Sequence, residues 1–518
     1  MESKSTDDNL RHIFTQTNYF MPLSENPLNR LRHSYILSDT MTLLKDRRVL
    51  VVGLGLFGGG VGVTRFLVRE GASVTVTDLR SAADLKESVE ALAGLPVTLK
   101  LGGHDEADFR SSDLVVANPA VPRRSKYLGI AEAAGVPITT EINLFFERCR
   151  ARILGVTGSS GKTTTTLLAG EMLRLADPRT RIGGNLGRPL IEEADAIPPD
   201  APVVLELSSF QLDRLRDLRR SPHVAVVTNL APNHLDVHGS VEAYITAKQG
   251  IIAHQAEEDT AVLNADDAEV SRWDRLCAGR VLCFSLDREV ELGTFLQAEQ
   301  IVGRLKDRII PVCPVRDLLL PGWHNVANAL AATAAALAWG VDPDRISTAL
   351  RAFKGAEHRL ERVAEIDGVR YINDSIATSP DRTIAALNAF DAPVLLIAGG
   401  YDKGIPFDPL GPAVAQRVRH LFLIGATADQ IAEVVERQGP SPAIHRCASL
   451  SDAVEAAASF AARGDVVLLS PACASYDTFR NFEERGRQFK ELVKSLCPTP
   501  SSAPPATSTT ARPPSSAP

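Results

Sequence analysis

The stretch GVTGSSGKTTTT at residues 155–166 constrains the fold and the chemistry of this chain more than any other part of its sequence. Apolar residues at 152–156 predict a strand, and the glycine- and serine-rich loop after it leads into a helix expected to open at Thr163. Such a loop points several backbone N–H groups at one place, where the helix N-terminus adds partial positive charge. The stretch therefore predicts a phosphate-binding loop, with ATP as the expected nucleotide.

Two side chains of this loop suit nucleotide chemistry. Lys162 has the reach to meet the outer phosphates, and the hydroxyl of Thr163 is placed to join the shell of a Mg²⁺ ion. The strict phosphate-loop pattern has glycine where Val156 stands, so the match fails at one position and an ordinary glycine–serine turn is the alternative. The residues expected to contact ATP here are Gly158, Ser159, Ser160, Gly161, Lys162, Thr163 and Thr164.

The composition is that of an ordinary globular protein. At 518 residues the chain is too long for one hydrophobic core, which suggests about three domains. A net charge of −7 argues against a general nucleic-acid binder. We see no secretory signal and no apolar run of the roughly 20 residues that a membrane span needs. Seven scattered cysteines without a CxxC pair indicate reduced thiols, so we expect a cytoplasmic protein without membrane insertion.

Strand, loop and helix patterns alternate along three successive segments of the chain. They predict an α/β fold of three domains, each a mostly parallel sheet with flanking helices. The predicted domains cover residues 46–148, 149–354 and 355–496. Residues 1–45 lack a clear period and are expected to form a flexible extension, and the Pro/Ser/Thr-rich tail at 497–518 is expected to be disordered.

The first predicted domain begins with a second glycine loop. Gly53, Gly55 and Gly58 form a GxGxxG pattern after an apolar strand, and Asp78 ends the next strand. This is the outline of a dinucleotide-binding unit, with an acid placed for a ribose hydroxyl. A lone GxGxxG is a weak signal, so the residues predict a nucleotide ligand and leave its identity, NAD included, open.

The central segment contains candidate metal ligands. Glu206 ends a buried-looking strand and is expected to face the phosphate loop, where a carboxylate suits Mg²⁺; capping a helix or pairing with an arginine is the alternative. His234 and His238 lie four apart with an aspartate between them, which resembles a zinc pattern. Because Pro232 and Gly239 lie in the same stretch, a shared helical face is not assured, and a solvated turn is the alternative.

Further polar residues follow predicted element boundaries. Lys248 lies on a predicted helix, and spacing alone places it on a solvated face. Asn325 and Asn328 lie three apart near a helix start, where they could share a face toward a base or phosphate or cap the helix. Arg359 is the kind of residue that steadies a transferring phosphoryl group. Lys403 and Ser475 follow strand ends in the last domain and could hold an anionic acceptor.

Taken together, these motifs resemble the Mur ligase family over residues 46–496. The segments that carry the resemblance are GLGLFGGG, VTGSSGKTTTT, GGNLG, LELSSFQL, NHLDVHGSVEAYITAK, GWHNVANALAA, EHRLE, NDSIAT, AGGYDKG and LSPACASYDTFRNFEERG. LELSSFQL and LSPACASYDTFRNFEERG resemble the branch that adds D-glutamate. The resemblance implies a Rossmann-like N-terminal domain, a central phosphate-loop ATPase domain and a Rossmann-like C-terminal domain. In the known pattern, a lysine occupies the position of Ile376.

The resemblance also implies a function. The implied activity is that of an ATP-dependent amide ligase, which adds D-glutamate to UDP-N-acetylmuramoyl-L-alanine through an acyl phosphate in cytoplasmic peptidoglycan precursor synthesis. It implies a monomer with ATP, two Mg²⁺ sites and a carbamylated Lys248, and UDP rather than NAD on the first domain. A sister ligase for L-alanine or a diamino acid, a nicotinamide-dependent oxidoreductase and a non-catalytic nucleotide-binding scaffold are the alternatives.

The site residues that the resemblance implies fall into five groups. The catalytic residues are Lys162, Glu206, His234 and Lys248. The metal ligands are Thr163, Glu206, His234 and Lys248. The further nucleotide contacts are Asn325, Asn328, Arg359 and Asp374. The contacts of the UDP precursor are Leu54, Asp78, Arg80, Asn118 and Asn185. The D-glutamate contacts are Thr378, Lys403, Ser475 and Phe482.

Overall fold

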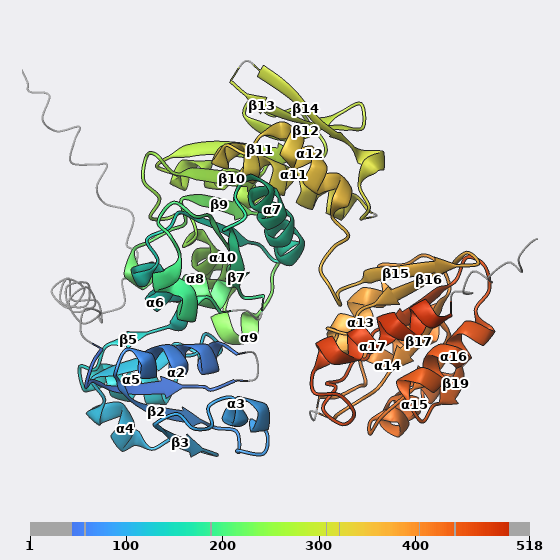
Figure 1. The fold of residues 1–518 in the computed structure, drawn as a ribbon, viewed down its shortest axis with the longest axis horizontal. Coiled ribbons are helices and arrows are strands. Elements are labelled where there is room, and N and C mark those ends of the chain that lie inside the picture. The colour runs from blue at the N-terminus through green and yellow to red at the C-terminus, as the bar shows by residue number, and fades with distance from the viewer. Residues whose placement is uncertain are drawn as a thin grey trace, which may run out of the picture. The chain divides into compact units, whose positions relative to one another are not determined.

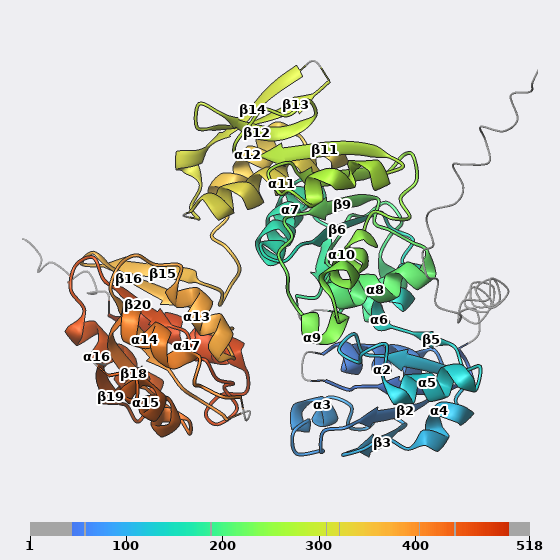
Figure 2. The same ribbon diagram turned by 180° about the vertical axis from the view of Figure 1, so that it is seen from behind.

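A computed structural model describes residues 44–55, 58–186, 189–306, 308–320, 322–402, 405–439 and 442–496 (Figures 1 and 2). The chain divides into two compact units, Met1–Ala352 and Phe353–Pro518. The first unit contains two β-sheets and the second contains one, and helices flank each sheet. The predicted α/β fold class is confirmed. Nearly all of the predicted N-terminal extension and all of the C-terminal tail lie outside the described residues, and the predicted domain boundaries remain predictions.

The first sheet is wholly parallel, with strand order β3-β2-β1-β4-β5. Its strands are β1 (Arg48–Val52), β2 (Ser73–Asp78), β3 (Val97–Leu101), β4 (Leu114–Ala117) and β5 (Ile138–Thr139). Its helices are α2 (Gly59–Arg69), α3 (Lys86–Glu90), α4 (Glu106–Ser111), α5 (Lys126–Ala133) and α6 (Glu141–Arg148). The strand order reverses between β1 and β4, and in open α/β sheets ligands bind beyond the carboxyl ends of the strands at such a reversal.

The second sheet has nine strands, in the order β14-β13-β12-β11-β10-β9-β6-β8-β7. They are β6 (Ile153–Thr157), β7 (Arg181–Gly184), β8 (Val203–Glu206), β9 (Val224–Val227), β10 (Thr260–Asn264), β11 (Arg280–Ser285), β12 (Gly293–Gln297), β13 (Gln300–Leu305) and β14 (Arg308–Pro314). From β7 to β12 in this spatial order, β6 included, all neighbouring strands pair in parallel. Strands β12, β13 and β14 form an antiparallel meander that the sequence analysis did not predict.

Helices and short 3₁₀ turns connect these strands. They are α7 (Lys162–Ala176), η1 (Ile191–Ala196), α8 (Ser209–Leu218), α9 (Leu235–His238), α10 (Val241–Gln249), η2 (Val270–Leu276), η3 (Val315–Asp317), α11 (Trp323–Trp339) and α12 (Pro343–Ala352). Helix α11 packs against α7, and both views show the two helices side by side at the sheet (Figures 1 and 2). The alanines in the middle of α11 are buried. Because their side chains are small, this helix can approach its neighbours closely. No helix among the described residues is long and apolar enough to cross a membrane.

The second unit is built on one six-stranded sheet, with the order β15-β16-β20-β17-β18-β19. Its strands are β15 (Glu361–Ile366), β16 (Val369–Asn373), β17 (Val394–Ala398), β18 (Val418–Leu423), β19 (Ala443–Arg446) and β20 (Val466–Leu469). Its helices are α13 (Pro380–Leu387), α14 (Leu410–Arg417), α15 (Ala428–Glu436), α16 (Leu450–Phe460) and α17 (Phe482–Ser495). All neighbouring pairs are parallel except β15–β16. The loops after β16, β17 and β20 therefore meet at one edge of this sheet.

Candidate functional site

The phosphate loop lies between β6 and α7, as predicted. Helix α7 begins at Lys162, one residue before the predicted start, and Gly161 caps it with a φ of 76°. Gly158 has a φ of 153°, a conformation open to glycine alone. A Cβ atom on Gly158 would lie 1.9 Å from Thr228 Oγ1, and one on Gly161 would lie 2.2 Å from Asn328 Oδ1. Both positions therefore require glycine for conformation and for space.

Residues after β9 hold the loop in shape. The backbone N–H of Ser160 donates to Asn229 Oδ1 over 2.9 Å, and that of Ser159 donates to the Asn229 carbonyl over 3.0 Å. Thr228 Oγ1 donates to the Ser160 carbonyl over 2.6 Å. The neighbouring strand thus sets the loop conformation through contacts far apart in the sequence.

Two lysine ammonium groups converge on one carbonyl of the loop. Lys162 Nζ donates to the Gly158 carbonyl over 3.0 Å, and Lys248 Nζ donates to the same oxygen over 2.8 Å. Lys248 lies on α10 and is only 1% exposed, so its placement on a solvated helix face is wrong. Burial and, to a smaller extent, the nearby charge of Lys162 lower the pKa of Lys248 to about 7, and the charge of Glu206 opposes this. The structure thus brings two predicted catalytic lysines together.

Glu206 faces the loop, as predicted. It ends β8 and is buried, and its Oε2 accepts a hydrogen bond from Thr163 Oγ1 over 2.6 Å. Its Oε1 accepts from Asn185 Nδ2 over 2.8 Å, so the structure places Asn185 beside the predicted metal ligands. Hydroxyl and carboxylate oxygens are the hard donors that Mg²⁺ prefers, and this ion commonly takes only one or two protein carboxylates beside phosphates and water. The donor set fits Mg²⁺.

The histidine pair packs on one aromatic ring. The His234 ring centroid lies 5.0 Å from that of Phe210, and His238 stacks on the same ring at 5.2 Å. His238 Nε2 lies 3.0 Å from Ser209 Oγ, and His234 has a positive φ of 54°. Within the described ranges there is no group of three or more His, Cys, Asp or Glu that could hold a metal. The described residues therefore do not support the zinc interpretation.

Two asparagines near the start of α11 lie on the same face, which is one of the two placements that the sequence allowed. Asn328 Nδ2 donates to Asn325 Oδ1 over 3.3 Å. Asn328 Oδ1 also accepts from Thr165 Oγ1 of α7 over 3.3 Å. The amide of Asn328 thus packs against the phosphate loop and the first turn of α7.

The glycine loop of the first sheet is organised by an acid rather than by lysines. Asp78 Oδ2 accepts from the backbone N–H of Gly55 over 3.2 Å, and Asp78 Oδ1 accepts from that of Arg80 over 2.9 Å. Asn118 Nδ2 donates to the Gly53 carbonyl over 3.2 Å. Asp78, Arg80 and Asn118 therefore lie around this loop, as the prediction of a shared site requires.

Leu54 differs from the other predicted precursor contacts. Its side chain is fully buried in the core of the first unit, so only its backbone is placed to face a ligand. A Cβ atom on Gly60 would lie 2.1 Å from the Leu54 carbonyl, which shows how closely α2 approaches the loop. The side chain of Arg80 is exposed.

In the second unit, Asp374 lies immediately after β16. Its Oδ1 accepts from the Leu360 backbone N–H over 3.1 Å and its Oδ2 from Ser470 Oγ over 2.8 Å. Burial raises the pKa of Asp374 to about 7, while these hydrogen bonds and the charge of Arg359 oppose the rise. The structure therefore places the predicted nucleotide contacts Arg359 and Asp374 at one turn.

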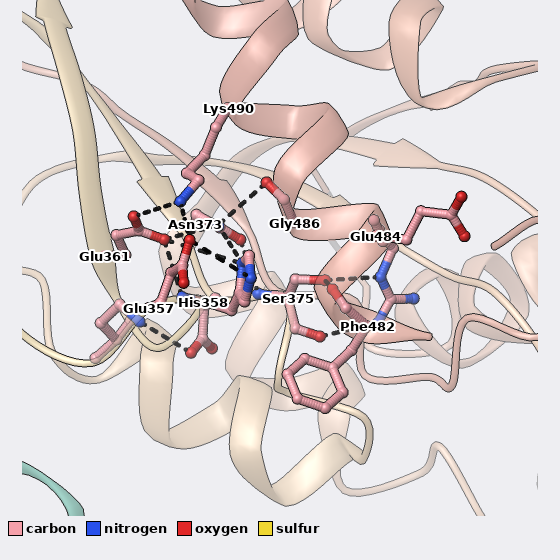
Figure 3. Close-up of polar contacts among 12 residues, drawn as sticks. Glu357, His358, Glu361, Asn373, Ser375, Phe482, Glu484, Gly486 and Lys490 are labelled. Carbon is pink, nitrogen blue, oxygen red and sulfur yellow. Dashed lines mark hydrogen bonds and ion pairs between the residues drawn. The ribbon is translucent and has the colours of Figure 1, made fainter. Parts of the chain in front are cut away.

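Three of the four predicted acceptor residues, Thr378, Ser475 and Phe482, lie in segments at the carboxyl edge of the third sheet. Ser475 is buried and Thr378 is half-buried. Phe482 opens α17, and its carbonyl accepts from Ser375 Oγ over 2.7 Å (Figure 3). Lys403 lies outside the described residues.

Arg485 joins these acceptor segments, and the sequence analysis did not identify it. It is 1% exposed, and its guanidinium donates to the carbonyls of Ser375, Cys473 and Ala474 over 2.9–3.2 Å. Burial lowers its pKa to about 10. An arginine one turn into an amphipathic helix carries no sequence signal of burial, so only the fold reveals this role.

Three family models match the chain. The Mur ligase MurD-like N-terminal domain matches residues 47–140, the Mur ligase middle domain matches 156–336, and the Mur ligase glutamate ligase domain matches 358–473. These ranges contain the glycine loop of the first sheet, the phosphate loop, and the turn of Arg359.

Curated relatives resemble the chain over nearly their whole length. The UDP-N-acetylmuramoylalanine–D-glutamate ligase of Roseiflexus sp. (strain RS-1) is 47% identical over 465 residues, which are 88% of this chain and 99% of that protein. The protein of the same name from Symbiobacterium thermophilum is 46% identical over 87% of this chain and 98% of its own. The solved structure of the UDP-N-acetylmuramate–alanine ligase MurC from Thermotoga maritima matches with a TM-score of 0.53 at 21% identity, over 87% of this chain and 99% of that one, which is a likeness of fold alone.

Proposed function

The chain belongs to the Mur ligase family, and from this premise we propose that it joins D-glutamate to UDP-N-acetylmuramoyl-L-alanine at the expense of ATP. The observation that carries the proposal is the 40–47% identity to relatives named for this reaction, over nearly their full length. The intact phosphate loop, with Lys162, Thr163 and Glu206 in contact around it, supports the use of ATP.

The proposed reaction has two steps. A carboxylate oxygen of the precursor's alanine attacks the γ-phosphorus of ATP, ADP leaves, and an acyl phosphate forms. The neutral amine of D-glutamate then attacks the acyl carbon, and phosphate leaves with the electrons of the C–O bond while the nitrogen loses a proton. The loop N–H groups and Lys162 hold the phosphates and offset the negative charge that gathers on their oxygens.

The first Mg²⁺ is assigned to Thr163 and Glu206, whose oxygens already lie in contact. When bound, this ion neutralises phosphate charge and orients the nucleotide. We assign a second Mg²⁺ to His234 and a carbamylated Lys248. Carbamylation requires the neutral amine, which attacks CO₂, forms an N–C bond and releases a proton. A buried Lys248 with a pKa of about 7 supplies that neutral amine near neutral pH, and the product is an oxygen-donor anion.

The remaining contacts are assigned by group. Asn325, Asn328, Arg359 and Asp374 are assigned to the nucleotide, and Leu54, through its backbone, Asp78, Arg80, Asn118 and Asn185 to the UDP precursor. Thr378, Lys403, Ser475 and Phe482 are assigned to D-glutamate. We also propose a monomer that works in the cytoplasm, where nucleotide substrates occur. The six cysteines within the described ranges are unpaired, which is consistent with a reducing compartment.

Product mass tests the proposal directly. Purified protein is incubated with Mg²⁺, ATP and UDP-N-acetylmuramoyl-L-alanine, and D-glutamate, L-glutamate and a diamino acid are offered separately; UDP-N-acetylmuramate with L-alanine tests the sister reaction. We expect product and equal ADP release only with D-glutamate. ADP without a coupled product would indicate another acceptor or precursor, and no ADP would favour a scaffold. Lys248→Ala is expected to lose activity and to regain part of it when short carboxylates replace the missing carbamate.

A further inference from the structure

The turn that presents Arg359 is held in an unfavourable backbone conformation. Its two neighbours, His358 and Leu360, have positive φ angles of 61° and 44°. Residues with a Cβ atom rarely adopt this left-handed region, and they remain there only when the surrounding structure holds them. The conformation of Arg359 therefore depends on contacts that fix this turn from outside.

One set of contacts fixes the His358 side. Its ring is buried, and its Nδ1 lies 2.9 Å from Asn373 Nδ2 (Figure 3). The Asn373 amide is oriented by its Oδ1, which accepts from the Ser375 N–H, so its nitrogen faces His358 and donates. The imidazole is therefore neutral with its proton on Nε2, in keeping with a pKa that burial lowers. A Cβ atom on Gly486 would lie 2.1 Å from His358 Nδ1, so α17 packs directly on this ring.

A second set of contacts joins the two ends of the turn to α17. Lys490 Nζ donates to Glu357 Oε1 and, over 3.0 Å, to Glu361 Oε1 (Figure 3). The other oxygen of Glu361, Oε2, accepts from the His358 backbone N–H over 2.9 Å and from Asn373 Nδ2 over 3.0 Å. One ammonium group thus bridges the residue before the strained segment and the residue after it.

This bridge differs from an ordinary surface ion pair, which contributes little to stability. The side chains of Lys490 and Glu361 are only 19% and 18% exposed, whereas that of Glu357 is 63% exposed, so the difference lies in the Lys490–Glu361 pair. Removal of the ammonium would leave the carboxylates of Glu357 and Glu361 on one turn without the cation that they share. We propose that Lys490 is a positioning residue that locks the Arg359 turn onto α17. Its effect on catalysis rests on the proposed function, because Arg359 is there a nucleotide contact.

Hydrogen exchange tests the structural half of the inference without any substrate. Lys490→Met is compared with Lys494→Met, because Lys494 is an exposed lysine one turn further along the same helix. We expect the amides of residues 358–360 to exchange about fivefold faster in Lys490→Met, since loss of one hydrogen bond of ordinary net strength shifts a local opening equilibrium by about this much. Lys494→Met is expected to match the wild type. Unchanged exchange in Lys490→Met would overturn the inference.

Steady-state kinetics test the catalytic half. We expect Lys490→Met to lower kcat/KM for ATP about tenfold, with KM for the UDP precursor unchanged and most activity restored in Lys490→Arg. In an Arg359→Ala background, Lys490→Met is expected to add less than about twofold, because the residue acts through Arg359. Either of two results would overturn the inference and leave Lys490 with a general structural role. The first is a loss of about tenfold in kcat/KM for ATP when Lys490→Met is added to Arg359→Ala. The second is a change of about tenfold in the KM for the UDP precursor in Lys490→Met. A wild type without D-glutamate ligation would instead contradict the proposed function, while hydrogen exchange still decides the role of Lys490.

Discussion

The two glycine loops of the first unit share a backbone plan and differ in charge. Both follow a strand that pairs in parallel with a neighbour on each side, and Gly58 and Gly161 cap the following helices with φ angles of 81° and 76°. Around the first loop, the carboxylate of Asp78 accepts from the loop N–H of Gly55 and from the N–H of Arg80 beside it. Around the second, Lys162 and Lys248 donate to a loop carbonyl.

This difference shows that a glycine loop alone does not specify its ligand. An acid near the loop suits the hydroxyl groups of a ligand such as those of a ribose, whereas ammonium groups attract the phosphates of a nucleotide. The side chains that the neighbouring strands bring to each loop therefore distinguish the two loops. The predictions below test this contrast between the acid-organised and the lysine-organised loop.

Removing the cation of the second loop is expected to have the largest effect. Lys162→Met is expected to lower kcat for ADP release by about 10³-fold, a loss typical of a group that stabilises transferring phosphoryl charge. ADP release is measured at saturating precursor, and circular dichroism confirms folding. A loss below about tenfold would show that the loop backbone carries the phosphate chemistry alone.

Matched glycine substitutions separate the two loops. Gly158→Ala is expected to raise the Kd for ATP by about 30-fold or more, because the new Cβ would lie 1.9 Å from Thr228 Oγ1 in a conformation that only glycine adopts. At Gly55 the Cβ would meet its first atom at 3.3 Å. Gly55→Ala is therefore expected to leave the Kd for ATP within about twofold, since it strains only the first loop. Titration calorimetry with ATP measures both variants, and equal weakening would break the assignment of separate ligands.

The pH dependence of activity tests the second lysine of the phosphate loop. The pKa of Lys248 is lowered from 10.5 to about 7, so the neutral amine that can be carbamylated amounts to about a tenth at pH 6, half at pH 7 and nine-tenths at pH 8. At fixed dissolved CO₂, activity is expected to rise at least about tenfold from pH 6 to pH 8, because the neutral amine increases with pH and carbamylation also releases a proton. Lys248→Arg is expected to be nearly inactive and to show no such rise with pH, because arginine keeps its charge. A flat profile in the wild type would contradict carbamylation.

The acid of the first loop is expected to have the smallest effect. Asp78→Asn keeps the size of the side chain but weakens the hydrogen bonds to the N–H groups of Gly55 and Arg80. Loss of a charged hydrogen bond is expected to raise KM for the UDP precursor about fivefold and to leave KM for ATP unchanged. Initial rates over a range of each substrate measure both values. A change in the KM for ATP alone, with the KM for the UDP precursor unchanged, would reverse the ligand assignment of the two loops.

Much of the fold follows from local pattern. Short apolar runs between polar turns, such as those of β4, β17 and β20, carry a strong local signal for strands. The meander of β12, β13 and β14 and the edge strands β15 and β19 were missed. Their residues are only partly apolar, so these strands carry a weaker local signal.

The candidate site was predictable to a similar degree. The phosphate loop and the orientation of Glu206 toward it followed from motif and strand position. The burial of Lys248 and the role of Arg485 did not, since a cation on a helix has the same sequence signature whether water or protein surrounds it. Leu54 shows the same limit, because its buried side chain is set by the packing of α2.

The sequence by itself determined where the loops, strands and helices form, because glycine conformations, apolar periods and helix starts are local properties of the chain. Only the tertiary structure decided which charges meet. Lys162 and Lys248 lie far apart in the sequence yet donate to one carbonyl, and Lys490 reaches back to Glu357 and Glu361. The pKa of a buried group and the rigidity of a strained turn depend on such long-range contacts, since both are set by the atoms that replace water around them.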